Sequence, residues 1–210
     1  MFEDFNDDLA VALGNPQFPG HLQVDADRIV DPRIGAAFAS RSLDLEQLSV
    51  SYMVNAEDFF QACTRTWTWQ HLQSLALTSQ LLQYMGSRQE IYALLCGAGI
   101  AALQMPRLHT LALWNSTGGD ACAFIYHTDR DCAYITWRGT WDLELSPRVV
   151  KVWQCLAFKV HSSELRIDKQ RIQGVIGSHG DAIHHLDLPC RVVEPTSLWQ
   201  IRMEGAQRTM

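Results

Sequence analysis

The stretch LQSLAL at residues 72–77 belongs to a pattern that occurs three times in the first half of the chain. The same arrangement, Leu-x-x-Leu-x-aliphatic, occurs as LEQLSV from Leu45 and as LHTLAL from Leu108. In each copy one small residue separates the last two apolar positions, and this alternation is typical of a short strand buried on one face. The pattern therefore predicts three parallel strands.

Each interval between these strands contains a segment that resembles a helix. The segments are NAEDFFQAC and SRQEIYALLCGAGIAALQM, in which Asn55 and Ser87 stand at N-cap positions. Glu57, Asp58 and Glu90 then fall in the first turn, where the helix dipole favours acidic side chains. A strand followed by a helix is the unit of a leucine-rich repeat, and about three units make a stable solenoid.

The repeat is degenerate. Its full consensus has Asn or Cys eight residues after the first Leu, whereas this chain has Met53, Gln80 and Ser116. Three unrelated buried strands of another α/β domain remain the alternative. A solenoid would turn a small, uncharged set of side chains towards its concave face, namely Gln47, Ser49, Ser51, Ser74, Ala76, Thr78, Thr110, Ala112 and Trp114.

The pattern changes at STGGD, residues 116–120, which predicts two units at residues 1–118 and 119–210. Residues 133–145, AYITWRGTWDLEL, alternate between apolar and polar side chains, as in a strand bent at Gly139 with one solvated face. ACAFIYH pairs with this strand across TDRD as a hairpin. Trp137 and Trp141 are then core residues.

The second unit also contains helical signals. SPRVVKVWQCLAFKVHSSEL has Ser146 at the N-cap, Pro147 at the first helical position and an amphipathic spacing of apolar residues. A short strand near LRIDKQRI and a helix in SHGDAIHHL complete a small α+β unit. We expect this unit to cover the open end of the solenoid.

The stretch GSHGDAIHHLDL, residues 177–188, holds three of the eight histidines beside two aspartates. Ser178 followed by Asp181 is typical of a capping pair at a helix start. The spacing H-x-x-x-H that is common at zinc sites is absent. We therefore interpret the stretch as a capped helix and expect no catalytic residue, metal or other cofactor.

The alternative is a metal-dependent or acid/base hydrolase centred on this helix. Its candidate cluster is His179, Asp181, His184 and His185. It requires histidine or acidic residues of the hairpin region to converge on the helix in a concave pocket. The candidates for that contribution are His127, Asp142 and Glu144.

Composition excludes several classes of function. Lys and Arg number 17 against 23 Asp and Glu, a net charge of −6 without a basic run, which argues against a nucleic-acid partner. The longest nearly apolar run, residues 91–103, is too short for a spanning helix of about 20 residues. The acidic start MFEDFNDDLAVAL is unlike a signal peptide, and the six cysteines contain no Cys-x-x-Cys pair. We expect a cytoplasmic or nuclear protein with buried thiols, neither secreted nor bound to a membrane.

The sequences of several segments resemble those of one protein family. FEDFNDDLAVAL, RSLDLEQLSVSYMV, LQSLALTSQLL, MPRLHTLALWN, ITWRGTWDLELSPRVVKVW, SHGDAIHHL and PTSLWQIR together resemble the C-terminal region of fungal F-box-type proteins with a carboxy-terminal domain of unknown function. The resemblance implies an F-box that docks onto a Skp1-type adaptor of a ubiquitin ligase. Residues 1–30 contain no such segment, so a Skp1 contact requires an F-box supplied elsewhere.

These observations predict a non-catalytic protein-protein interaction module with an unknown protein partner. The resemblance implies the substrate-recognition half of an F-box-type ubiquitin-ligase adaptor. An interaction surface would present an apolar or aromatic patch near Trp114 or Trp199. A product that folds without a present function is the remaining alternative.

Overall fold

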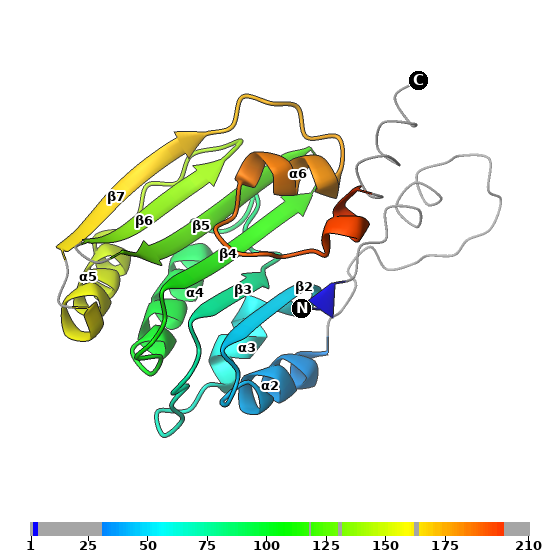
Figure 1. Ribbon diagram of the computed structural model, residues 1–210. Coiled ribbons are helices and arrows are strands. Elements are labelled where there is room, and N and C mark those ends of the chain that lie inside the picture. Colours follow the sequence, from blue (N-terminus) through cyan, green and yellow to red (C-terminus); the bar gives the residue numbers. More distant parts are fainter. Residues whose placement is uncertain (1, 4–30, 118, 130–131, 162–163, 200–210) are drawn as a thin grey trace.

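The strands form one seven-stranded mixed sheet in which they lie in chain order from β1 to β7 (Figure 1). The computed structural model describes residues 2–3, 31–117, 119–129, 132–161 and 164–199. Pairs from β1 to β4 are parallel, β4–β5 and β5–β6 are antiparallel, and β6–β7 is parallel. The strands are β1 (Phe2–Glu3), β2 (Gln47–Asn55), β3 (Ser74–Thr78), β4 (Thr110–Thr117), β5 (Asp120–Thr128), β6 (Cys132–Gly139) and β7 (Glu164–Arg171).

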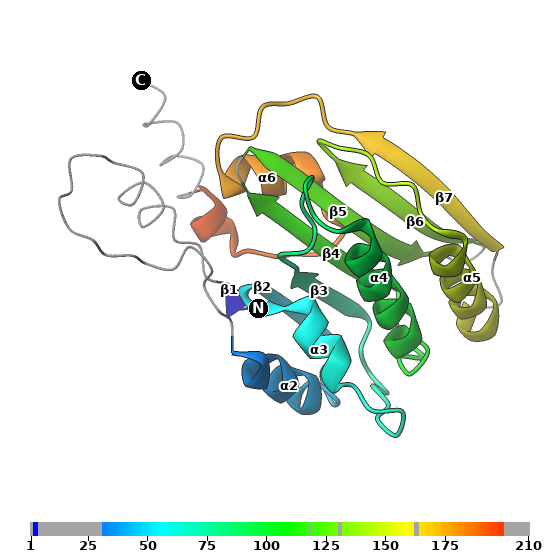
Figure 2. The same cartoon turned by 180° about the vertical axis from the view of Figure 1, so that it is seen from behind.

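Helices cover both faces of the sheet, but unequally (Figures 1 and 2). One face carries α2 (Pro32–Arg41), α3 (Ala56–Ala62), α4 (Arg88–Ala102) and α5 (Pro147–His161). The other face carries α6 (His179–Leu186). Two neighbouring parallel strands must be joined by a crossover connection, and such connections are right-handed. Because each new strand is added on the same side of the previous one, the crossover helices α3, α4 and α5 lie on the same face of the sheet.

The three Leu-x-x-Leu segments form β2, β3 and β4, as predicted. Leu48 pairs with Leu75, and Leu75 pairs with Leu111, in one continuous parallel register. All three leucines are buried in the core between the sheet and α2–α5. A parallel arrangement of strands alternating with helices is therefore confirmed.

Local capping explains where the helices begin. The Ser87 hydroxyl accepts a hydrogen bond from the Glu90 amide at 3.4 Å, as its N-cap position predicts. Asn55 also precedes its helix, but its side chain accepts from the Gln80 amide at 3.3 Å and does not cap α3. At the start of α5, the Ser146 hydroxyl accepts a hydrogen bond from the Val149 amide at 3.4 Å.

The predicted hairpin is present as β5 and β6, although residues 130–131 of its turn lie outside the described residues. β6 ends at Gly139, where a Cβ atom would lie 2.9 Å from that of Cys122. The chain then turns, and Trp141 packs against Trp137 with ring centroids 4.7 Å apart. The Trp137 indole donates to the Trp141 carbonyl at 2.9 Å. The strand predicted to run to residue 145 therefore ends at Gly139, whereas the burial of both tryptophans is confirmed.

The predicted solenoid with a terminal cap finds no support in the described chain. β4 pairs with β5 from Thr110↔His127 to Thr117↔Asp120, so one sheet continues across the expected boundary at residues 118–119. Helix α6 lies over a face of this sheet, where Ala76 and Ala112 are buried, and not over its end. The face expected to be concave and open is therefore largely covered. Residues 4–30 of the first predicted unit lie outside the described residues.

Candidate functional site

Helix α6 begins as the capping pair predicts. The Ser178 hydroxyl accepts a hydrogen bond from the Asp181 amide at 3.1 Å. The Asp181 carboxylate in turn accepts from the Gly177 amide at 3.2 Å, so both residues satisfy backbone donors at the helix start. The helix ends at Asp187, whose left-handed backbone (φ 43°) terminates the regular hydrogen bonding.

The apolar side of α6 forms a second core on the sheet. Ala182, Ile183 and Leu186 pack with small residues of β3, β4 and β5. Trp114 belongs to this core and is 0% exposed. The expected interaction patch at Trp114 is therefore wrong, because its strand position turns it towards α6 and not towards solvent.

Arg138 of β6 holds the other end of α6 against the sheet. Its Nη1 donates to the main-chain carbonyls of Leu186 at 2.5 Å and Asp187 at 2.9 Å. Its Nε donates to the Gln170 side chain of β7 at 2.7 Å, which orients the guanidinium. A charged donor thus satisfies carbonyl groups that a helix end leaves without an intrahelical partner.

The three histidines of α6 point to different surroundings. His179 packs against the ring of Tyr52, with centroids 4.8 Å apart. His185 lies against Gly174, where an added Cβ would be 2.5 Å from the imidazole Cε1. His184 is exposed, and its ring centroid is 5.4 Å from that of His185. The helix therefore disperses the predicted cluster.

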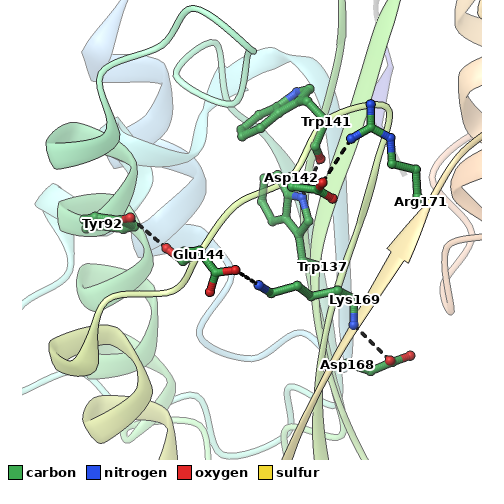
Figure 3. A network of polar contacts seen from close by, with 8 residues as sticks. All are labelled: Tyr92, Trp137, Trp141, Asp142, Glu144, Asp168, Lys169 and Arg171. Carbon is green, nitrogen blue, oxygen red and sulfur yellow. Dashed lines mark hydrogen bonds and ion pairs between the residues drawn. The ribbon is translucent and has the colours of Figure 1, made fainter.

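The acidic residues proposed to join this cluster have other partners (Figure 3). Asp142 forms an ion pair with Arg171 at 3.0 Å, and Glu144 forms one with Lys169. His127 lies near the end of β5, beyond the β5 residues that pack in the core under α6, and its Nδ1 atom is 3.4 Å from the Thr110 hydroxyl. Across the described ranges, no three His, Cys, Asp or Glu side chains are grouped so that they could hold a metal ion.

A hollow of about 300 Å³ opens between the C-terminal part of α6 and the segment at residues 188–198. We call it the α6 hollow. It is lined by Ile183, His184, Asp187, Leu188, Cys190, Arg191, Val192, Val193, Pro195 and Leu198. Ile183, Val192 and Val193 are nearly fully buried and make its apolar base, whereas His184, Asp187 and Arg191 are exposed around it. Of the predicted cluster, only His184 reaches this hollow.

Sequence reasoning did not identify the segment that completes the α6 hollow. The Ser51 hydroxyl of β2 donates to the Val192 carbonyl at 2.9 Å and fastens the segment to the sheet. The adjacent valines Val192 and Val193 between two prolines were the available signal, since an apolar pair in a polar tail usually has a packing partner. Trp199 follows this segment and is 66% exposed.

The thiol in the α6 hollow is not activated. Burial raises the pKa of Cys190 to about 11, and a hydrogen bond with Ser74 opposes that shift. The thiol is therefore protonated at neutral pH, whereas a nucleophilic cysteine needs a lowered pKa. The hollow therefore presents an apolar surface with charged residues at its margin, and its cysteine is not a nucleophile at neutral pH.

Residues 1–194 match a family of unknown function, DUF6546. The chain belongs to this family. The DUF6546 match includes all of β1 to β7 and α6, and it ends before Trp199. Its description assigns no function and mentions neither fungi nor an F-box, so those parts of the sequence resemblance stay predictions.

The DUF6546 chain has no significant match among curated proteins or solved structures. Within the parts of the chain that the structure covers, none of the helices has the length and apolar character needed to cross a membrane.

Proposed function

We propose that this chain is a non-catalytic protein-protein interaction module that binds an apolar side chain of its partner in the α6 hollow. The observation that carries the proposal is the hollow itself, which combines an apolar base with charged residues at its margin. Its volume of about 300 Å³ is at the lower end of the range for ligand pockets. That size suits one large anchoring side chain, which is how many protein interfaces obtain their affinity.

The charges at the margin favour an acidic residue next to the anchor. Asp187 lies 3.4 Å from Arg138 and is balanced by it. Arg191 is exposed and forms no ion pair with another described residue. A carboxylate of the partner beside Arg191 would improve electrostatic complementarity and specificity.

Trp199 supplies a second feature of interaction surfaces. Its neighbour Leu198 lines the α6 hollow, and 66% of Trp199 is exposed. Tryptophan is enriched among residues that dominate binding energy because it offers a large, rigid contact area. We therefore assign Trp199 to the margin of the same binding surface.

The hydrolase alternative depends on residues that lie apart. His179 and His185 pack on different parts of the molecule, while Asp142 and Glu144 pair with β7. Nothing in the dispersed arrangement supports acid/base chemistry on α6. The narrower role, the substrate-recognition half of an F-box-type adaptor that docks onto Skp1, rests on the sequence resemblance alone.

The test is selection of peptides from a random display library on the purified chain, followed by affinity measurements by fluorescence anisotropy. We expect selected peptides to share a large apolar residue next to an acidic one. Arg191→Glu and Trp199→Ala should each weaken binding by about tenfold or more. Arg107→Glu, an exposed change in the loop before β4, is the matched control and should leave affinity unchanged.

Two results would contradict the proposal. One is a selection that enriches no sequence family. The other is a set of selected peptides that bind Arg191→Glu and Trp199→Ala as tightly as the unchanged chain.

A further inference from the structure

Strand β7 forms an open edge of the sheet. It pairs with β6 without a break from Cys132↔Glu164 to Gly139↔Arg171, and it pairs with no other described strand. The Ile172 amide donates to the Gly139 carbonyl at 2.9 Å, so this residue points its backbone groups towards β6. Since backbone direction alternates along a strand, Leu165, Ile167, Lys169 and Arg171 point theirs outwards.

One of these outward groups is occupied by a side chain. The Lys169 amide donates to the Asp168 carboxylate at 2.9 Å, where a neighbouring strand would supply a carbonyl (Figure 3). An exposed edge amide bonds to water or to a nearby side chain, and here the preceding side chain supplies the acceptor. The Asp168 side chain thus occupies a backbone donor that an added strand would use.

The two faces of β7 differ in their remaining charge. Lys169 and Arg171 pair with Glu144 and Asp142 on the helix-covered side. On the other side, Arg166 and Asp168 lie beside Tyr134 and Thr136 of β6. Neither Arg166 nor Asp168 has an ion-pair partner among the described residues.

We propose that β7 binds β7 of a second copy of this chain in antiparallel register, about a two-fold axis at Ile167. A two-fold axis normal to the sheet pairs residues that share a face. With the axis at Ile167, each Arg166 lies opposite Asp168 of the other copy, giving two ion pairs. Ile167, which is 42% exposed at mid-strand, then lies opposite its own copy.

Charge excludes the neighbouring registers. An axis at Asp168 places two carboxylates opposite each other, and an axis at Lys169 places two ammonium groups there. Like charges directly opposite on paired strands are destabilising. An axis at Arg166 likewise places two guanidinium groups opposite each other, so of the axes at residues 166–169 the one at Ile167 avoids facing like charges and forms ion pairs.

This pairing also satisfies the outward backbone groups. Ile167 exchanges two hydrogen bonds with its copy, and Leu165 exchanges two with Lys169 of the other copy on each side. Asp168 leaves the Lys169 amide and binds the incoming Arg166. One strand pair is small beside a standard interface of about 1,600 Å², so we expect a weak dimer that dissociates on dilution.

The experiment is sedimentation velocity over a range of concentrations with charge-swapped variants. Arg166→Asp and Asp168→Arg should each weaken self-association by about tenfold or more, because two ion pairs become two repulsions. An equimolar mixture of the two single variants should form a heterodimer, since each strand then faces its complement. The double variant R166D/D168R should dimerise like the unchanged chain.

Arg65→Asp, an exposed reversal in the loop after α3, is the control for net charge and should dimerise normally. Arg191→Glu should also dimerise normally, which separates this edge from the α6 hollow. Circular dichroism checks that every variant is folded. The proposal is overturned if the unchanged chain is monomeric at all concentrations, if single variants dimerise like it, or if neither the mixture nor the double variant recovers the dimer.

Discussion

The Arg138 guanidinium lies 2.5 Å from the main-chain carbonyl of Leu186, and this contact joins β6 to the end of α6. The same group reaches the Asp187 carbonyl, so one side chain satisfies two carbonyls at the helix end and positions the helix on the sheet. Only 18% of this side chain is exposed, which limits competition from water. The position of α6, and with it the α6 hollow, depends on this residue.

Replacing Arg138 with Ala should lower the free energy of unfolding by about 1–3 kcal/mol, because charge-assisted hydrogen bonds to two carbonyls are lost. Urea denaturation measures the change. Arg171→Ala is the control, since Arg171 and Asp142 are both mostly exposed and such pairs contribute less than about 1 kcal/mol. An equal loss in both variants would contradict the special role of Arg138.

Tyr52 joins three elements through one ring. Its hydroxyl lies within hydrogen-bond distance of both the amide (3.0 Å) and the carbonyl (3.2 Å) of Ser116, and its backbone has φ 61° at a bulge in β2. Tyr52→Phe keeps the ring contacts with Trp114 and His179 but removes the hydroxyl. We expect a loss of about 1–3 kcal/mol in thermal or urea unfolding. Tyr84→Phe, at an exposed tyrosine, should have little effect, and an unchanged stability for Tyr52→Phe would refute the bridging role.

Glu57 should make stability depend on pH. Burial raises the pKa of Glu57 above its ordinary 4.5, opposed by hydrogen bonds from its own backbone amide and the Ser79 hydroxyl. Folding therefore favours the protonated acid, so its contribution is retained at low pH and lost as pH rises from the ordinary pKa through the raised one. Glu57→Gln cannot ionise and should gain stability relative to the unchanged chain across that rise. Urea unfolding from acid to neutral pH measures this, with exposed Glu46→Gln as control; a difference that does not change with pH would contradict it.

Metal content separates the two functional hypotheses. We expect elemental mass spectrometry on the purified chain to find no stoichiometric transition metal. The His184→Ala, His185→Ala double variant should give the same result. Stoichiometric zinc that disappears in a folded double variant would instead favour the hydrolase.

Local patterns predicted most elements of this fold, although helix α2 was not among them. The strands at Leu48, Leu75 and Leu111 follow from alternation, and the start of α6 follows from Ser178 and Asp181, because each signal involves residues close in sequence. The burial of Trp114 could not be predicted from such local signals. Alternation with Leu113 places it on the opposite face, but whether that face meets solvent depends on α6, more than 60 residues later in the chain.

The site was harder to predict for the same reason. Histidines and aspartates in one short stretch suggest a cluster, yet helix geometry sends His179 and His185 to different neighbours. The α6 hollow arises from contact between a helix and a segment whose docking uses Ser51 of β2. No periodicity within either segment contains that information.

The identity of strand order and chain order has a consequence for how the molecule folds. β4, β5 and β6 are joined by short turns, so their contacts close small loops and form at little entropic cost. β2, β3 and β7 are joined to the sheet through longer crossover connections. Once β4, β5 and β6 have formed, their edges offer backbone groups with which these strands can pair. We therefore expect the sheet to form first at β4–β6 and then to extend towards both edges. Hydrogen exchange should be slowest in β5 and successively faster towards the two edge strands.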